Sequence, residues 1–199
     1  MMNEKYNKDR EKPLCAAEWR RNPMGRQEPI GVFDSGVGGL TVAREIMRQI
    51  PNERIVYFGD TARVPYGSKS KETVTKYSRQ IIRFLQTENV KAIVIACNTA
   101  SAFALDTMQK EFALPIIGVV KPGAKMAAQT TKNGKVGLIG TEGTIRSGVY
   151  AEFIKSFKPD VEVIGKACPL FVPLVEEGWL HDSVTDEVAA RYLKELQDK

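Results

Sequence analysis

Short apolar segments rich in β-branched residues alternate with longer segments of helical period along most of this 199-residue chain. Apolar runs that no polar residue interrupts are typical of strands buried on both faces, as strands of parallel sheets are. The segments between them place apolar residues at i, i+3, i+4 and i+7, as amphipathic helices do. The alternation therefore predicts an α/β protein with parallel sheets, right-handed crossovers and helices on the sheet faces.

The expected elements cover most of the chain after residue 29. The strands are expected at residues 30–33, 54–58, 92–96, 115–120, 135–140 and 161–165. The helices are expected at residues 40–50, 74–85, 105–112, 122–131 and 146–157, with a last one capped by Ser183. Residues 1–29 show neither period and are predicted to form a flexible N-terminal extension.

The composition narrows the class of protein. Hydrophobic residues make up 43% of the chain and charged residues 27%, which permits a packed core. The net charge of +5 is dispersed along the chain, so we expect no nucleic-acid partner. No apolar run approaches the roughly 20 residues that span a bilayer, and no signal peptide is recognised, so a cytoplasmic protein without membrane contact is expected. Three irregularly spaced cysteines and one histidine give neither a disulfide framework nor a zinc site.

Small polar residues follow the first predicted strand. Ligands of open parallel sheets bind beyond the carboxyl ends of the strands, so the segment DSGVGG at residues 34–39 is a candidate site. It matches neither of the common nucleotide-binding glycine motifs. A compact anion, bound by unpaired N–H groups at the start of the following helix, fits better. The alternative is a simple glycine turn in which Asp34 caps that helix.

Cys97 lies where the third predicted strand meets the next helix. The partial positive charge of the helix N-terminus is expected to lower the pKa of this thiol and raise its thiolate fraction. Asn98 and Thr99 add hydrogen-bonding groups at the same strand end. A buried structural cysteine is the alternative, and a hydrolase that uses His181 as base is a weaker one, because His181 is expected at the surface. Cys15 and Cys168 are expected to be structural or incidental.

Three motifs in this order carry a family resemblance. GVFDSGVGGLTV at residues 31–42, YFGDTARVPYGSKS at 57–70 and IACNTASA at 95–102 resemble the glutamate racemases of the aspartate/glutamate racemase superfamily. The similarity continues through IIGVVKPGA, VGLIGTEGTI and ACPLFVPLVEEG, and covers residues 29–199.

The resemblance implies a racemase without cofactor or metal, an isomerase in which two cysteines exchange the α-proton of glutamate on opposite faces. It implies that the enzyme supplies D-glutamate for peptidoglycan. Cys97 matches the cysteine that takes the proton from the D-enantiomer, and Asp34 and Ser35 match residues that contact the substrate amino group and assist this cysteine. The positions that hold the substrate carboxylates match Tyr66, Gly67, Asn98 and Thr99. Glu176 matches an acidic position that influences catalysis, and Thr141 and Thr144 match residues of the cleft.

The chain departs from the family pattern in one respect. Family members carry the second cysteine in a G-C-T-H motif, which these 199 residues do not contain. We therefore expect one half of the proton-transfer pair, in a first lobe at residues 30–96 that lacks its completion and a second lobe at 97–199. An exposed apolar edge would then favour association with another chain, such as a second copy. An aspartate racemase, or a non-catalytic fragment that binds a ligand or another chain, are the alternatives to a glutamate racemase.

Overall fold

Strands and helices alternate along the chain in the computed structural model, which describes residues 27–197. The strands are β1 (Ile30–Asp34), β2 (Ile55–Gly59), β3 (Ala92–Ile95), β4 (Ile116–Gly118), β5 (Lys135–Gly140) and β6 (Glu162–Ala167). The helices are α2 (Leu40–Gln49), η2 (Thr61–Arg63), α3 (Lys71–Thr87), α4 (Asn98–Glu111), α5 (Val120–Thr130), α6 (Glu142–Ser147), α7 (Val149–Phe157), α8 (Phe171–Glu176) and α9 (Ser183–Gln197). Most of the predicted N-terminal extension, with Cys15, lies outside the described residues.

Four parallel strands form the larger of two sheets, in the order β2-β1-β3-β4. Ile30 at the start of β1 lies opposite Ile55 of β2 on one side and Ala92 of β3 on the other. Every residue of β1 is buried, which agrees with the prediction that uninterrupted apolar runs are central strands. The prediction of an α/β fold with parallel sheets is confirmed.

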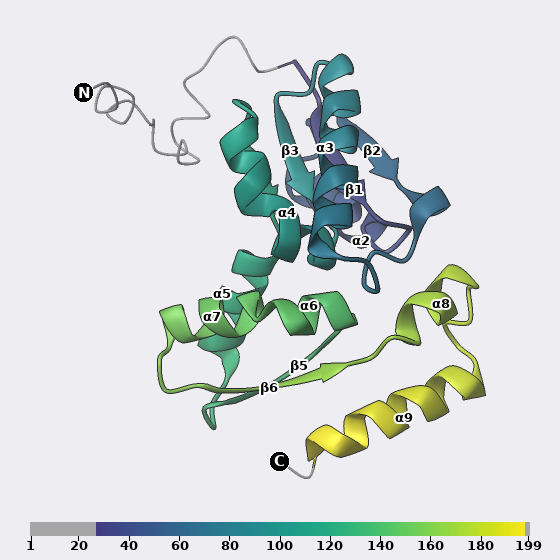
Figure 1. Ribbon diagram of the computed structural model, residues 1–199, viewed down its shortest axis with the longest axis vertical. Helices are drawn as coiled ribbons and strands as arrows, with labels where there is room; N and C mark the ends of the chain where they lie inside the picture. The colour runs from purple at the N-terminus through teal and green to yellow at the C-terminus, as the bar shows by residue number, and fades with distance from the viewer. Residues whose placement is uncertain (1–26, 198–199) are drawn as a thin grey trace.

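Helices cover both faces of this larger sheet (Figure 1). Phe33 of β1 belongs to the main apolar cluster with Ile81 of α3 and Met108 of α4. The neighbouring residue of β1, Val32, points to the opposite face and packs near Ile46 of α2. Successive side chains of a strand alternate between faces, so one short strand is covered by helices on both sides.

The smaller sheet pairs β5 with β6 in parallel (Figure 1). One of its faces packs against α5 and α7 through a second apolar cluster that includes Ala124, Ile154 and Val163. Helix α9 lies on the other side, where Glu195 forms an ion pair with Lys166 of β6. The boundary between two lobes after Ala96 stays a prediction. Strand β4, which follows this boundary in the sequence, pairs with β3 and belongs to the larger sheet.

Several element boundaries differ from the sequence-based expectation for local reasons. The strand expected at residues 115–120 ends at Gly118 because α5 begins at Val120, with Pro122 in the first turn, where its missing N–H costs no helical hydrogen bond. The helix expected at 146–157 is two helices, because Gly148 has a φ of 70° and ends α6. The last helix is capped by Asp182, whose Oδ1 accepts the N–H of Val184 at 2.8 Å, and not by Ser183.

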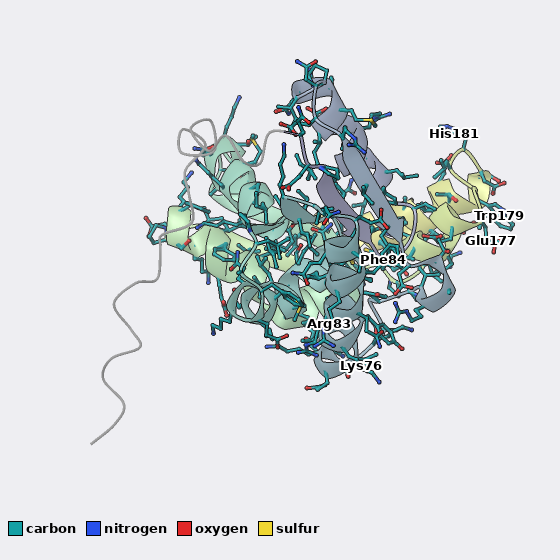
Figure 2. The ribbon with its side chains drawn as sticks, turned by 90° about the horizontal axis from the view of Figure 1, so that it is seen from above. Lys76, Arg83, Phe84, Glu177, Trp179 and His181 are labelled. Carbon is teal, nitrogen blue, oxygen red and sulfur yellow. The ribbon has the colours of Figure 1, made fainter. Side chains whose placement is uncertain are left out.

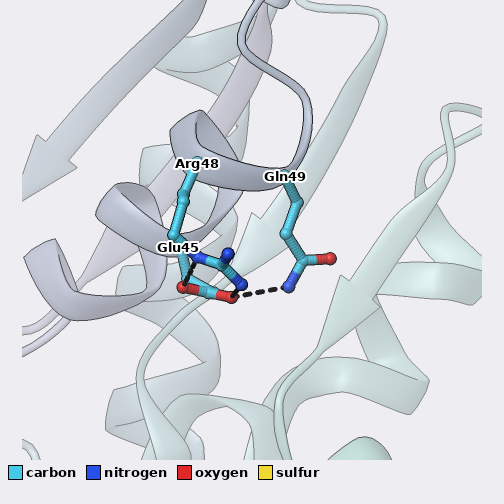
Figure 3. A network of polar contacts seen from close by, with 3 residues as sticks. All are labelled: Glu45, Arg48 and Gln49. Atoms are coloured by element: carbon cyan, nitrogen blue, oxygen red, sulfur yellow. Dashed lines mark hydrogen bonds and ion pairs between the residues drawn. The ribbon is translucent and has the colours of Figure 1, made fainter.

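The outer surface of α2 carries a local polar network (Figure 3). The carboxylate of Glu45 accepts hydrogen bonds from Nε and Nη2 of Arg48 at 2.9 and 2.6 Å and from the Gln49 amide at 2.7 Å. The Arg48 and Gln49 hydrogen bonds lower the pKa of Glu45 to about 2. These contacts join residues three and four apart on one exposed helix face, so they support the helix and not its packing.

No helix within residues 27–197 has the length and apolarity needed to cross a membrane.

Candidate functional site

The carboxyl ends of β1 and β3 bring the two main predicted site segments together. The two strands are neighbours in the larger sheet, so the residues that follow them meet at the same edge. Cys97 follows β3, and its Sγ lies 3.4 Å from Oγ of Ser35, which follows β1. Residues 62 positions apart in the sequence are therefore in hydrogen-bonding contact.

Cys97 is the N-cap residue of α4 and is only 5% exposed. Its Sγ accepts the N–H of Ala100 at 3.4 Å, which is the contact that a helix N-terminus offers. Burial, together with the nearby Asp34 carboxylate, nevertheless raises the pKa of Cys97 to about 11, although hydrogen bonds with Ser35 and Ala100 lower it. The prediction of a net lowered pKa was wrong, because removing the thiolate from water outweighs the helix N-terminus.

The loop at residues 34–39 is organised around the Asp34 carboxylate. Asp34 is 7% exposed, and its Oδ2 accepts the N–H of Gly36 at 3.1 Å and of Gly39 at 3.0 Å. The N–H groups of Leu40 and Thr41 bond to backbone carbonyls of the same loop. The N–H groups of Leu40 and Thr41 at the start of α2 are thus already bonded. Asp34 binds the loop and does not cap α2 as the alternative interpretation had it, because the N-cap residue Gly39 has no side-chain cap.

Two side chains from other elements reach the same loop. The Tyr57 hydroxyl, from β2, donates to the carbonyl of Gly36 at 3.2 Å. Oε1 of Glu176, at the end of α8, accepts the N–H of Val37 at 3.3 Å. Sequence reasoning missed Tyr57 because it lies inside an apolar strand, where an aromatic residue is ordinarily part of the core.

Tyr66 lies in the interior, with 1% of its surface exposed. Its hydroxyl donates to Oδ2 of Asp60, whose other oxygen accepts Nε of Arg63 at 2.9 Å. Burial and the hydrogen bond to Asp60 raise the pKa of Tyr66, so its proton stays in place. The role of Tyr66 toward a substrate stays a prediction. The position of Asp60 could have been found from the sequence, because Asp60 directly follows the second strand, at the sheet edge where site residues are expected.

Gly67, in the loop between η2 and α3, contacts the N-terminus of α6. The Gly67 carbonyl accepts the N–H of Gly143 at 2.8 Å. A Cβ on Gly67 would lie 2.4 Å from Cβ of Thr141, so only glycine permits this approach. The contact places the N-terminus of α6 beside the loop that Tyr66 begins.

Three threonine hydroxyls meet at the N-termini of α4 and α6. Oγ1 of Thr99 lies 2.8 Å from Oγ1 of Thr141 and 3.3 Å from Oγ1 of Thr144, and the last two are 3.0 Å apart. Asn98, beside them, accepts the Tyr150 hydroxyl on its Oδ1 at 2.6 Å. Each hydroxyl can donate one proton and accept others, so the group can reorganise around a ligand without a net loss of hydrogen bonds.

A cavity of about 400 Å³ adjoins this threonine group. Asn98, Thr141, Thr144 and Tyr150 contribute its polar wall, and residues of α5 and β5 contribute its apolar wall. A recess of this size, with hydroxyl and amide groups on one side, suits a small polar molecule better than an extended apolar one.

Cys168 and His181 lie away from these contacts. Cys168 is buried beyond β6, where its thiol approaches the carbonyl of Lys166 and its N–H donates to Gly140. His181 is exposed at the tip beyond α8, near Trp179 (Figure 2), as its predicted surface role requires. No group of three or more potential metal ligands occurs among the described residues.

The sequence is similar to known racemases over most of its length. Residues 30–198 match the family model described as Asp/Glu/Hydantoin racemase. The glutamate racemase of Geobacter metallireducens is 57% identical over 169 residues, which are 85% of this chain and 63% of that protein. That of Sulfurihydrogenibium is 54% identical, over 84% of this chain and 65% of the relative.

Solved structures agree with the sequence comparison. The glutamate racemase isoform RacE1 of Bacillus anthracis superposes with a TM-score of 0.84 at 41% identity, covering 87% of this chain and 65% of that one. The Francisella tularensis glutamate racemase, solved in complex with D-glutamate, gives a TM-score of 0.81 at 44% identity, with the same coverage of 87% and 65%. The chain thus spans less than two thirds of the length of these relatives.

Proposed function

Because this chain belongs to the Asp/Glu/hydantoin racemase family, we propose that it acts on glutamate as a racemase, with Cys97 as the base toward the D-enantiomer. The observation that carries the proposal is the identity of 57% to a glutamate racemase, over a stretch that includes the contact between Cys97 and Ser35. The proposed reaction uses no cofactor. Supply of D-glutamate for peptidoglycan in the cytoplasm is the role that this activity would serve.

The proposed chemical step is a proton transfer. The Cys97 thiolate takes the α-proton of D-glutamate, and the electron pair of the broken C–H bond moves onto the α-carbon and its carboxylate. Return of a proton to the same face regenerates D-glutamate, whereas a proton from the opposite face gives L-glutamate. Developing charge beside a carboxylate needs hydrogen-bond donors close to it, and we expect the hydroxyls and helix N-termini of this site to supply them.

The Cys97 surroundings support the role of base. Ser35 and the Ala100 amide hydrogen-bond to the sulfur and stabilise its anion, while burial keeps the pKa at about 11. A thiolate with a high pKa is scarce near neutral pH but is a strong base once formed. We propose that Asp34 and Ser35 also contact the substrate amino group, which would offset the negative charge that Asp34 places near the sulfur.

The carboxylates of the substrate would be held at the two facing helix N-termini. Asn98 and Thr99 lie at the start of α4. The hydroxyls of Thr99, Thr141 and Thr144, which are hydrogen-bonded to one another, can turn toward a bound carboxylate. The Tyr66 hydroxyl already donates its one proton to Asp60, so we expect the contribution of Tyr66 and Gly67 to come from their backbone.

Proton NMR of D-glutamate and of L-glutamate in deuterated buffer tests the proposal, with circular dichroism to follow interconversion of the enantiomers. We expect deuterium to enter the α-position of D-glutamate, and Cys97→Ala to abolish this exchange. Cys168→Ala is the matched control, since this second buried thiol lies outside the site and its loss should leave the exchange rate unchanged.

The two enantiomers separate a half-reaction from turnover. Exchange of D-glutamate alone would mean that Cys97 acts on one face, and exchange with conversion of both enantiomers would mean that a second acid completes the reaction. Exchange of aspartate in place of glutamate would correct the substrate. Absence of exchange with any of these amino acids, in protein whose fold is intact, would overturn the proposal.

A further inference from the structure

One peptide group of the loop after β1 is held at both of its polar atoms. The carbonyl of Gly36 accepts the Tyr57 hydroxyl at 3.2 Å, and the N–H of the same peptide group, which belongs to Val37, donates to Glu176 at 3.3 Å. Tyr57 belongs to β2 and Glu176 to α8, so two separate elements fix the plane of this peptide. The peptide before it, between Ser35 and Gly36, is tied by its N–H to Asp34.

The clamped peptide is one residue from the group that touches the sulfur. The hydroxyl of Ser35 lies 3.4 Å from Sγ of Cys97. Both the side chain and the backbone of Ser35 lower the pKa of Cys97, so they stabilise the thiolate. Hydrogen bonds of this kind weaken steeply with distance and angle, and a small rotation of the adjoining peptide would misdirect both.

Tyr57 is suited to act as a fixed donor. Tyr57 is partly buried, its hydroxyl is bonded to the Gly36 carbonyl, and the residue packs against the apolar cluster that contains Ile30 and Val32. Burial, with the negative groups of Asp34, Cys97 and Glu176 nearby, raises the pKa of Tyr57. The hydroxyl therefore keeps its proton near neutral pH and can donate it to the loop.

We propose that Tyr57 is a positioning residue for Cys97: its hydrogen bond to the Gly36 carbonyl holds Ser35 against the sulfur and so sets how readily the thiolate forms. The effect of Tyr57 on catalysis rests on the proposed function. Its effect on the reactivity of the Cys97 thiol does not. The Tyr57 hydroxyl is hydrogen-bonded to the Gly36 carbonyl and not to the sulfur, so Tyr57 acts through Ser35.

A double-mutant cycle on thiol reactivity tests this inference. Tyr57→Phe removes the hydroxyl and keeps the ring, Ser35→Ala removes the direct contact, and the double variant carries both changes. The rate of Cys97 alkylation by iodoacetamide is measured between pH 7 and 9.5 by mass spectrometry of the peptide that contains Cys97. In this range the rate follows the thiolate fraction, because the pKa of Cys97 is about 11.

We expect Ser35→Ala to slow alkylation about tenfold and Tyr57→Phe about threefold, as the loss or misalignment of one hydrogen bond to an anion would. In the Ser35→Ala background, Tyr57→Phe should slow alkylation by clearly less than threefold, because only the backbone N–H of residue 35 is then left for Tyr57 to align. Tyr192→Phe is the matched control, since its hydroxyl accepts the N–H of Leu170 beyond the smaller sheet and its loss should not change the rate.

Three results would overturn the inference. An unchanged rate in Tyr57→Phe would show that the hydroxyl is dispensable, and a faster rate would show that it only shields the sulfur. Equal slowing by Tyr57→Phe with and without Ser35 would show that Tyr57 acts by another route. Alkylation does not require turnover, so a protein that fails to exchange the α-proton of glutamate can still confirm or contradict the role of Tyr57.

Discussion

Opposing influences meet at the sulfur of Cys97. Burial and the Asp34 carboxylate disfavour the anion, whereas Ser35 and the Ala100 amide favour it, and the pKa settles at about 11. A helix N-terminus by itself lowers a thiol pKa, so the sequence neighbourhood of Cys97 was misleading on this point. Burial of the sulfur decides the balance, and the Asp34 carboxylate that adds to it comes from β1.

This raised pKa predicts a pH-dependent stability. The folded protein holds the Cys97 proton more tightly than the unfolded chain, whose thiol has an ordinary pKa of 9.0. The stabilisation that results is fully present below pH 9 and is lost as the pH rises through about 11. It amounts to about 2 to 3 kcal/mol, two pH units at about 1.4 kcal/mol each.

Urea unfolding of the unmodified protein and of Cys97→Ala, at pH 8 and again near pH 11, measures this contribution. The difference in the free energy of unfolding between the two proteins should shrink by about 2 kcal/mol or more toward high pH. Groups other than Cys97 titrate in both proteins and cancel in the comparison. A difference that stays constant with pH would contradict the buried state of the thiol.

Helices α3 and α4 each contain a buried serine, and the two serines have opposite hydrogen-bonding surroundings. Ser101 of α4 donates to the carbonyl of Ile95 at 2.9 Å and accepts the N–H of Val119 at 3.2 Å, so it ties α4 to β3 and to the start of α5. Ser78 of α3 is fully buried, and within residues 27–197 its hydroxyl has no hydrogen-bonding partner. A buried polar atom without a partner costs free energy that its removal restores.

Replacing each serine by alanine should therefore change stability in opposite directions. Ser78→Ala is expected to raise the free energy of unfolding by about 1 kcal/mol, since it removes an unsatisfied hydroxyl and favours the helix. Ser101→Ala should lower it by about 1 to 3 kcal/mol, because two backbone groups lose their partner. Thermal and urea unfolding of both variants provide the comparison. Destabilisation by Ser78→Ala would mean that its hydroxyl finds a partner in solution.

The elements show where sequence patterns suffice and where they do not. Apolar runs located the six strands of residues 27–197 within a few residues, because burial on both faces leaves a clear signal. The division between α6 and α7 at Gly148 was missed, since a helical period continues through a single glycine. The short helix α8, which carries Glu176, was not expected because six residues are too few to show a period.

Across the whole protein, the parts built on the two sheets meet through small polar groups. The contacts are the Gly67–Gly143 hydrogen bond, the three threonine hydroxyls, and the hydrogen bonds that Tyr150 donates to Asn98 and Val37 donates to Glu176. The apolar clusters, by contrast, each belong to one sheet and its helices among the described residues. Polar contacts of this kind can exchange partners when a ligand enters, whereas a packed apolar interface resists such a change.

Gly67→Ala tests how far function depends on this junction. Its Cβ would meet Thr141 at 2.4 Å, so the N-terminus of α6 and the loop at residue 67 must move apart. We expect a loss of about 1 to 3 kcal/mol in stability and at least a tenfold slower exchange of the α-proton of D-glutamate.

Gly137→Ala is the matched control for this variant. A Cβ on Gly137, in β5, meets nothing closer than Leu196 at 3.6 Å, which is ordinary contact. This substitution should leave exchange unchanged. Equal effects of the two alanines on exchange would show that the junction at Gly67 plays no special part.

The sequence by itself determined the class of fold, the order of strands and helices, and the segments after β1 and β3 that carry the candidate chemistry. These properties follow from local patterns: apolar periodicity, glycine and capping residues, and motifs that resemble one family. Only the tertiary structure decided the raised pKa of Cys97 and the hydrogen bonds of Asp34 within its own loop. The same holds for the hydrogen bonds of Tyr57 and Glu176 to that loop. Glu176 lies 139 residues from Val37, and contacts at such separations depend on how whole elements pack, which no local pattern encodes.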